Sequence, residues 1–247
     1  MSRRVALVTG GIGGIGTAVC IELVNQDRLV IAGHLPEEDE IAGLWQSEMK
    51  TKGYEVEIAS GDVSDFESAG KMVEEINSRY GVIEILVNCA GITRDAFLAK
   101  MEPEDWMAVI NTNLNSVFNV TRQVIPGMMT AGFGRIVNIS SVNGQKGQFG
   151  QTNYSAAKAG MHGFTMALAQ EGARKGVTVN SVSPGYVETR MTAAVNKDIL
   201  NAIIKTIPMG RLATTTEIAQ TVAFLCLDQT SYVTGANIPV NGGMYMG

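Results

Sequence analysis

Cysteine and histidine are scarce in this sequence of 247 residues, which contains three cysteines and two histidines. Cys20, Cys89 and Cys226 are odd in number, lie far apart and never adopt a Cys-x-x-Cys spacing. Neither a disulfide framework nor a zinc site is therefore predicted, and a reducing compartment is favoured. His34 and His162 match no metal-binding or triad spacing, so surface or packing roles are expected and no metal site is predicted.

Positive charge is also sparse. Nineteen basic and 24 acidic residues give a net charge of −5, and no cluster of lysine and arginine extends beyond Arg3-Arg4. Without a basic surface that could follow a phosphate backbone, nucleic acid is not an expected partner. No apolar run reaches the ~18 residues needed to span a bilayer, and the first residues lack the pattern of a signal peptide. We expect a cytoplasmic protein with no membrane partner.

Proline is rare and glycine abundant, with 6 and 28 residues, and 45% of the chain is hydrophobic. This composition suits a buried core cut by tight turns. Short β-branched runs alternate with helical stretches, which predicts a doubly wound, Rossmann-type α/β fold, a parallel seven-stranded sheet with helices on both faces. The strands are expected at 5–9, 29–32, 55–59, 83–88, 135–140, 177–182 and 237–240. Helices are expected at 14–25, 38–52, 65–80, 104–129, 153–175 and 216–227.

Two features refine this expected architecture. Pro239 lies inside the last strand run and cannot donate to a sheet ladder, so this strand is predicted at an edge. No shift in composition and no repeat divides the chain, so one domain over 1–247 is expected. Within it, residues 186–211 lack a strand pattern and predict a small lobe or lid over the edge of the sheet.

A glycine-rich turn at residues 9–16 follows the first predicted strand and opens the first helix. Glycine permits a sharp turn, lets the backbone approach a pyrophosphate closely, and leaves the N–H groups of the helix N-terminus free to bind it. A tight turn without a ligand is the alternative, but the position between strand and helix favours a dinucleotide site. The predicted contacts are Gly10, Gly13, Gly14, Ile15 and Gly16.

Two further segments follow predicted strands at the edge where open sheets bind ligands. Asp62-Val63 follows the third strand, where a carboxylate and an N–H group could bind the adenine edge; equally, Asp62 or Asp65 could only cap the next helix. Asn88, Ala90 and Gly91 end the fourth strand, and small residues there permit close approach of a cofactor. A packing turn is an equal alternative for this second segment.

Ser141, Tyr154 and Lys158 are the strongest candidate catalytic group. Tyr154 and Lys158 are four residues apart on a predicted helix and therefore share a face, and Ser141 lies just past the fifth strand. A carbonyl reduced by hydride develops negative charge on oxygen and needs a positioned acid and a second hydrogen-bond donor, which fits Tyr154 and Ser141. The Lys158 ammonium is expected to lower the pKa of Tyr154 from its ordinary value of about 10.

Together these blocks resemble the short-chain dehydrogenase/reductase family over nearly the whole chain, including Pro184-Gly185 followed by Thr189. The resemblance implies hydride transfer between a nicotinamide dinucleotide and a carbonyl, with Tyr154 as the proton donor. It implies cofactor contacts at Tyr154, Lys158, Pro184, Gly185 and Thr189. It also assigns Asn113 the role of holding a helix open for a water that relays protons to Lys158. Cys89 departs from the second asparagine usual in its block.

Residues 138–154 are very similar to those of bacterial acetoacetyl-CoA reductases of polyhydroxybutyrate synthesis, and residues 91–95 and 242–247 agree with that subgroup. This resemblance implies an acyl-CoA substrate. The substrate contacts it implies are Ser141, Tyr154, Gln148, Phe149, Gln151 and Tyr186, with Asp95 and Lys100 near the CoA arm. For Lys100 a solvated surface lysine is an equal alternative.

Two rival functions remain at the level of sequence. A 3-oxoacyl-(acyl-carrier-protein) reductase shares every catalytic residue. A non-catalytic dinucleotide sensor or scaffold is the rival of another class, and the presence of Ser141, Tyr154, Lys158 and Asn113 together argues against it. The resemblance also implies a homotetramer, with Phe118, Met161 and Phe164 on the two long helices as candidate interface residues; burial within the monomer is the alternative.

The choice of dinucleotide depends on the loop after the second strand, where an acid accepts the ribose hydroxyl of NAD or a basic residue pairs the phosphate of NADP. Gly33 occupies the usual acid position, which taken alone favours NADP. However, residues 34–40 contain four carboxylates and no lysine or arginine, and Glu37 or Asp39 could accept hydrogen bonds from the ribose hydroxyls. NADH is therefore favoured over NADPH, with a solvated helix N-terminus as the alternative explanation of the acidic run.

Overall fold

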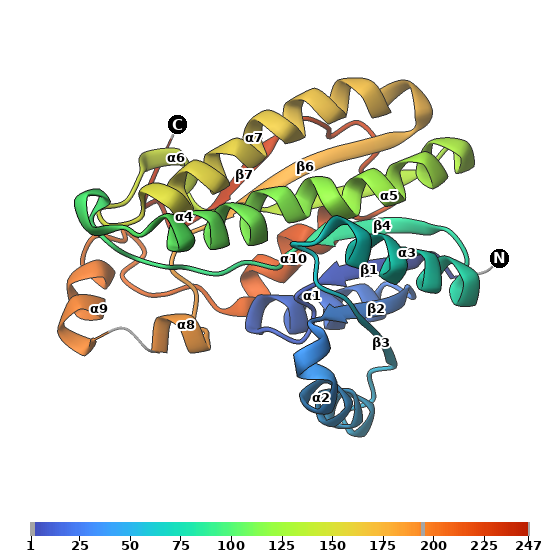
Figure 1. The fold of residues 1–247 in the computed structure, drawn as a ribbon, viewed down its shortest axis with the longest axis horizontal. Helices are drawn as coiled ribbons and strands as arrows, with labels where there is room; N and C mark the ends of the chain where they lie inside the picture. The colour runs from blue at the N-terminus through green and yellow to red at the C-terminus, as the bar shows by residue number, and fades with distance from the viewer. Residues whose placement is uncertain (1–2, 194–195, 247) are drawn as a thin grey trace.

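The fold is described by a computed structural model that covers residues 3–193 and 196–246. Seven strands form one sheet in the order β3-β2-β1-β4-β5-β6-β7, and every neighbouring pair is parallel. This arrangement confirms the predicted doubly wound α/β fold (Figure 1). The strands are β1 (Val5–Thr9), β2 (Leu29–His34), β3 (Val56–Ser60), β4 (Ile83–Asn88), β5 (Gly134–Ile139), β6 (Val177–Pro184) and β7 (Asn237–Val240).

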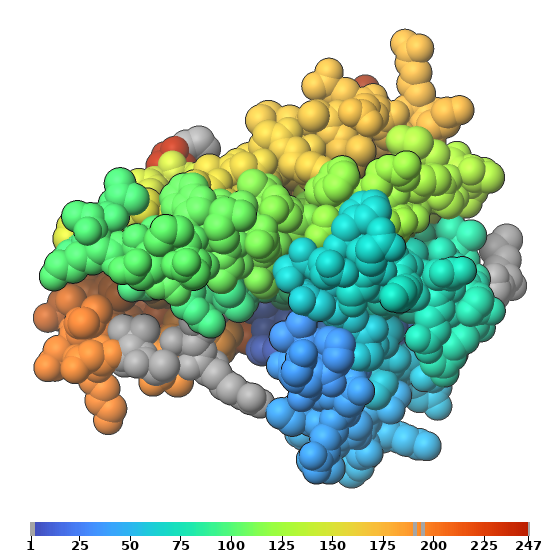
Figure 2. All heavy atoms as spheres, in the orientation of Figure 1, coloured from blue at the N-terminus to red at the C-terminus, as the bar shows by residue number. Residues whose placement is uncertain are grey.

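Alternate side chains of the strands enter two separate cores, one on each face of the sheet. Ala6 and Val8 of β1 pack in the core that contains α1 (Gly14–Asn25) and α10 (Thr215–Leu225), and Trp45 of α2 (Asp39–Thr51) packs against it. Val5 and Leu7 point into the other core. The helices of that core are α3 (Phe66–Tyr80), α5 (Ser116–Ala131) and α7 (Thr152–Gly172), and they form adjacent bands on one face in Figure 2.

The order of the strands creates the crevice that a ligand needs. From β1 the chain runs outward through β2 to β3, whereas β4 lies on the other side of β1. The loops that follow β1 and β4 therefore leave the sheet in opposite directions, which is where open parallel sheets bind ligands. At the far edge, β7 pairs only with β6 and contains Pro239, so the predicted edge position is confirmed.

The helix predicted over 104–129 is interrupted. The structure has α4 (Pro103–Ile110), a π-helical segment η3 (Asn111–Asn115) and then α5. The side-chain amide of Asn113 donates to the carbonyl oxygen of Val109, four residues earlier, at 2.9 Å. A side chain bonded to this carbonyl competes with the regular backbone ladder, and π-helical turns inside α-helices are frequent at functional sites.

Several short elements were not predicted. Helix α6 (Val142–Lys146) follows β5, and the 3₁₀ segments are η1 (Pro36–Glu38), η2 (Leu98–Lys100) and η4 (Ala173–Lys175). The segment 186–211 contains α8 (Arg190–Ala193) and α9 (Lys197–Ile204) and makes one isolated bridge between Val187 and Ala213, while 194–195 and Gly247 lie outside the described residues. Across the described ranges, no helix combines the length and apolarity needed to cross a membrane.

The candidate interface residues differ in burial. Met161 is fully buried inside the protein, so the expectation that it lies at an interface is wrong, and Phe164 is half-buried. Phe118 is 51% exposed, and its ring stacks on that of Phe66 at a centroid distance of 6.0 Å.

Candidate active site

The glycine turn forms a cradle at the start of α1. Gly10 has a φ of +61°, and a Cβ there would lie 3.0 Å from the Cα of Ala90. A Cβ on Gly16 would collide with the carbonyl oxygen of Gly10. Helix α1 begins after Gly13. Because glycine has no side chain that could cap the helix, the N–H groups of the first turn remain available to an anion. These features fit a dinucleotide pyrophosphate.

The ends of β1 and β4 are joined directly beneath this cradle. The hydroxyl oxygen of Thr9 accepts hydrogen bonds from the N–H groups of Cys89 at 3.0 Å and Ala90 at 3.2 Å. Asn88 is buried and donates to the side-chain oxygen of Asn138 on β5 at 2.8 Å. The two predicted cofactor segments, the glycine turn and the end of β4, are therefore held next to each other.

The loop after β2 lies beside the glycine turn. The carbonyl oxygen of Gly33 accepts a hydrogen bond from the N–H of Gly11 at 2.9 Å. Glu37 is exposed in η1, whereas a carboxylate oxygen of Glu38 accepts from the N–H of Leu35 at 3.2 Å. Glu37 is thus open to a ligand at a loop whose base contacts the cofactor cradle.

Of the two aspartates near the start of α3, only Asp65 is its cap. Asp65 caps α3 by accepting from the N–H of Ser68 at 2.7 Å. The carboxylate of Asp62 instead accepts from the N–H and the hydroxyl of Ser64, at 2.8 and 2.7 Å. Val63 is buried, and its carbonyl accepts from Asn119 at 3.0 Å. Asp62 is therefore not the helix cap, which leaves its carboxylate as a candidate for the adenine edge.

Pro184 and Gly185 lie at the end of β6, and Thr189 after them approaches the cradle. The N–H of Gly185 donates to Val240 on β7 at 2.9 Å, and a Cβ on Gly185 would lie 2.9 Å from the Cα of Asn241. The methyl carbon of Thr189 lies 3.1 Å from the place that a Cβ on Gly14 would occupy. The segment therefore folds back over the glycine turn.

Ser141, Tyr154 and Lys158 converge at the end of β5. Ser141 caps α6 by accepting from the N–H of Asn143 at 3.1 Å, and its side chain lies close enough to Tyr154 to act on the pKa of that phenol. Lys158 is 4% exposed, and its ammonium donates to the carbonyl oxygen of Ile139 at 2.7 Å. The Nζ atom of Lys158 lies 5.5 Å from the centre of the Tyr154 ring.

Asn113 connects the π-helical segment to the loop after β4. Its side-chain amide donates to the carbonyl of Ile92 at 2.9 Å, and its oxygen accepts from the N–H of Ile92 at 3.0 Å. A Cβ on Gly91 would collide with this oxygen and would lie 3.5 Å from the Nζ of Lys158. The absence of a side chain at Gly91 thus lets Asn113 and Lys158 approach one another.

Burial dominates the electrostatics of this group. It raises the pKa of Tyr154 to about 12, because the effect of the Ser141 side chain only partly offsets the loss of solvent and the Asp95 carboxylate raises the pKa further. Burial also lowers the pKa of Lys158 to about 8. The expectation that the pKa of Tyr154 is lowered is therefore wrong, and the phenol is protonated at neutral pH.

A cavity of about 460 Å³ is lined by Tyr186, which lies close enough to Tyr154 to raise the pKa of its phenol. Two of the predicted acyl-pocket residues, Gln148 and Tyr186, line it, and Lys146 is a lining residue that the sequence did not single out. Its remaining lining residues are Ile199, Ala202, Ile203, Thr206 and Met244. The cavity therefore combines an apolar wall from α9 with polar groups from the loop around α6.

The other predicted substrate residues lie around this loop. Gln151 donates to the Asp95 carboxylate at 2.9 Å and accepts from the side-chain amide of Asn143 at 2.9 Å. Phe149 is 82% exposed, and its ring packs against that of Phe97 at a centroid distance of 4.7 Å. Lys100 is exposed at the end of η2 and does not line the cavity. Its position therefore agrees with the alternative that Lys100 is a solvated surface lysine.

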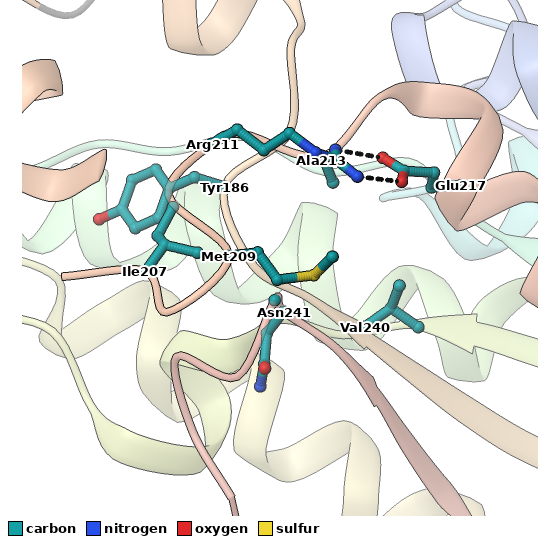
Figure 3. Close-up of a pocket in the computed structure, with 9 residues that line it drawn as sticks. Tyr186, Ile207, Met209, Arg211, Ala213, Glu217, Val240 and Asn241 are labelled. Carbon is teal, nitrogen blue, oxygen red and sulfur yellow. Dashed lines mark hydrogen bonds and ion pairs between the residues drawn. The ribbon is translucent and has the colours of Figure 1, made fainter. Parts of the chain in front are cut away.

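Tyr186 also lines a smaller pocket of about 70 Å³ between β7 and the end of the 186–211 segment (Figure 3). Met209 and Asn241 both line it, and the side chain of Arg211, which also lines it, extends toward Glu217. The guanidinium of Arg211 donates to both carboxylate oxygens of Glu217, at 2.8 and 2.6 Å. This pair ties the end of the lobe to the first turn of α10.

Sequence patterns did not reveal Thr9 and Asn143 as organisers of the site. Thr9 ends a strand of ordinary composition, and its role depends on the neighbouring β4 loop. Asn143 lies on α6, which at five residues is too short to show helical periodicity.

Comparison with known proteins agrees with this geometry. Residues 4–200 match the family model described as short chain dehydrogenase. An acetoacetyl-CoA reductase of Allochromatium vinosum is 61% identical over 98% of this chain and 99% of its own length. An acetoacetyl-CoA reductase of Cupriavidus necator is 52% identical over the full length of both chains. A 3-oxoacyl-(acyl-carrier-protein) reductase of Pseudomonas aeruginosa is 46% identical over 100% of this chain and 99% of its own.

These matches cover the glycine cradle and the Ser141, Tyr154 and Lys158 group. The similarity extends over the whole length of relatives that are oxidoreductases by name. The chain belongs to the short-chain dehydrogenase family and is an oxidoreductase that uses a nicotinamide dinucleotide.

Proposed function

We propose that this protein reduces the keto group of a 3-oxoacyl thioester, converting acetoacetyl-CoA to (R)-3-hydroxybutyryl-CoA for polyhydroxybutyrate synthesis. The observation that carries the proposal is the convergence of Ser141, Tyr154 and Lys158, with Tyr154 close to Tyr186, which lines a cavity together with Gln148. The whole chain acts as one catalytic domain, in which 186–211 serves as the substrate lobe. Its three unpaired cysteines suit a reducing cytoplasm.

The residues of the group take distinct roles in this proposal. Tyr154 is protonated at neutral pH and donates its proton to the carbonyl oxygen as negative charge develops there. The Ser141 hydroxyl is the second hydrogen-bond donor to that oxygen. Lys158 stabilises Tyr154 as it gives up its proton, and Asn113 holds the π-helical segment open for a water that resupplies protons to Lys158.

The dinucleotide supplies the hydride when it is bound. Its pyrophosphate would be held by the cradle of Gly10, Gly13, Gly14, Ile15 and Gly16. Its adenosine would be held by residues of the β2 and β3 loops, and its nicotinamide half by the ends of β4 and β6 and by the catalytic helix. The remaining proposed contacts are Gly33, Glu37, Asp62, Val63, Asn88, Ala90, Gly91, Tyr154, Lys158, Pro184, Gly185 and Thr189.

The carrier of the acyl group separates this function from its nearest rival. We expect kcat/KM for acetoacetyl-CoA to exceed that for the matching acyl-carrier-protein thioester by about tenfold or more, because the relatives of highest identity described above are acetoacetyl-CoA reductases. Both substrates are to be compared in steady state at one ionic strength. A preference for the carrier-protein thioester would favour 3-oxoacyl-(acyl-carrier-protein) reductase, the name of the relative from Pseudomonas aeruginosa.

We propose NADH as the preferred cofactor on electrostatic grounds. The loop over residues 34–40 contains four carboxylates and no lysine or arginine, and Glu37 is exposed in it. A phosphate ~6–8 Å from one carboxylate is repelled by about 2–3 kcal/mol at an effective dielectric constant of 20, before screening by salt. The ribose hydroxyls of NADH carry no charge, so Glu37 can accept hydrogen bonds from them without this repulsion.

We therefore expect kcat/KM for NADH to exceed that for NADPH, and we expect Glu37→Ser with Glu40→Arg to shift the ratio toward NADPH by about 10- to 100-fold. Glu48→Ser is the matched control, because this exposed acid lies near the other end of α2 and pairs with Lys52 at 2.7 Å. A tenfold preference of the unaltered protein for NADPH would mean that the acidic loop points away from the ribose.

We also propose a homotetramer in which α5 and α7 pack across a two-fold axis. The proposal is supported by the exposed pair of Phe66 and Phe118, because apolar aromatic pairs on a surface mark protein interfaces. Light scattering should return the mass of four chains, and Phe118→Glu should lower it. A monomer mass for the unaltered protein at micromolar concentration would rule out this assembly.

A further inference from the structure

His162 is the centre of a buried polar chain that the catalytic proposal does not use. It lies one helical turn after Lys158 on α7, and its Nε2 atom is 2.8 Å from the hydroxyl of Ser140 and 3.3 Å from that of Ser183. Both serines are buried, with 3% and 0% of their surface exposed. Three elements therefore meet at one ring nitrogen: the end of β5, helix α7 and the end of β6.

The partners of the two serines determine which atom carries each proton. The Ser140 hydroxyl is 2.8 Å from the carbonyl oxygen of Lys158, which can only accept, so this serine donates there. The Ser183 hydroxyl donates to the side-chain oxygen of Asn237 at 2.7 Å. Each serine has used its only proton, so both oxygens face His162 as acceptors, and Nε2 must be the donor.

The ring is neutral in this arrangement. Burial lowers the pKa of His162 below its ordinary value, so a single proton remains on the imidazole at neutral pH. The hydrogen bonds place this proton on Nε2 and leave Nδ1 without one. In a histidine that only fills space, no hydrogen-bond partner fixes the tautomer. His162 therefore differs from such a residue.

Each of the two serines is next in sequence to a residue of the proposed active site. Ser140 precedes Ser141, and Ser183 precedes Pro184-Gly185. Lys158 is bound at both ends, since its carbonyl accepts from Ser140 and its ammonium donates to Ile139. We propose that His162 is a positioning residue that, through Ser140 and Ser183, holds the Ser141 loop and the cofactor turn at Pro184-Gly185 in register with the catalytic helix.

The tautomer can be measured directly. The sequence contains two histidines. In the other one, His34, the Nδ1 atom lies 3.0 Å from the carbonyl oxygen of Leu35, which can only accept, so this Nδ1 carries a proton. Nitrogen-15 NMR of histidine-labelled protein at neutral pH should therefore show one ring with its proton on Nε2 alone, and His162→Gln should remove it. A His162 ring protonated on Nδ1 alone would overturn the proposal.

Kinetics test the positioning role, which also depends on the proposed reductase function. His162→Leu should lower kcat by about 10- to 100-fold, since small misplacements of reacting groups cost that much. His162→Gln keeps a side-chain N–H donor and should recover most of kcat. Leu168→Ala, a half-buried side chain of α7 that packs in the core with α3 and α5, is the control for loss of stability.

The outcomes separate the two proposals. If His162→Leu loses no more kcat than Leu168→Ala at the same fall in Tm, or if His162→Gln recovers nothing, His162 is only a packing residue. If the unaltered protein reduces no 3-oxoacyl thioester, the proposed function fails, while the NMR result still decides the hydrogen-bond chain.

Discussion

Tyr154→Phe is expected to lower kcat/KM for acetoacetyl-CoA by about 10²- to 10⁴-fold, the range typical of losing a general acid. The substitution keeps the ring that fills the site and removes only the hydroxyl. That hydroxyl is protonated at neutral pH because burial raises the pKa of Tyr154 to about 12, so the protein holds a proton ready for donation. The cofactor Kd should stay within about threefold, because the glycine cradle is untouched.

Tyr80→Phe is the matched control for this experiment. Tyr80 lies at the end of α3, and its hydroxyl donates to the Glu57 carboxylate at 3.1 Å, away from the candidate catalytic group. Removing this hydroxyl should leave turnover unchanged. Near-normal turnover in Tyr154→Phe would show that another group supplies the proton.

Lys158→Met is expected to reduce kcat by at least about 10²-fold and to move the optimum of the remaining activity to higher pH. Because burial lowers the pKa of Lys158 to about 8, its charged form is present below that pH and is lost as the pH rises through it. The unaltered protein should therefore lose activity above about pH 8, and the methionine variant should lack this alkaline limb. A pH profile of the same shape in both proteins would contradict the role of Lys158.

Stability provides a second measure of the same pKa. Lys158 has a pKa of about 8 in the folded protein and an ordinary value of 10.5, so between these values the unfolded chain binds more protons. The free energy of unfolding, relative to that of Lys158→Met, should therefore rise by about 3 kcal/mol at most as the pH increases from 8 to 10.5. A constant difference across this range would mean that Lys158 is not desolvated.

The fold could be predicted because its signals are local. Each strand is a short β-branched run between turn residues, and β1, β4 and β7 have the predicted bounds. Pro239 identified an edge strand through the chemistry of one residue. The glycine turn was recognisable because its position between a strand and a helix is itself visible in the sequence.

The parts that could not be predicted depend on contacts between distant segments. Asn113 of the π-helical segment hydrogen-bonds to Ile92, which lies 21 residues away in the chain, and a local pattern gives no signal of that contact. The pKa of Tyr154 depends on how deeply its side chain is buried, and the four-residue spacing from Lys158 does not predict that burial. Met161 lies on a long predicted helix, as the other candidate interface residues do, and only the packed structure shows that its side chain is buried within the protein.

The central claim is that this protein is a working reductase of 3-oxoacyl thioesters, not a dinucleotide-binding sensor. It is tested most directly by adding acetoacetyl-CoA to purified protein with NADH or NADPH and following both the reduced nicotinamide and the acyl product. The account predicts steady oxidation of the cofactor, with one equivalent of (R)-3-hydroxybutyryl-CoA formed for each equivalent oxidised. Binding of the cofactor without its oxidation, with either dinucleotide, would contradict it.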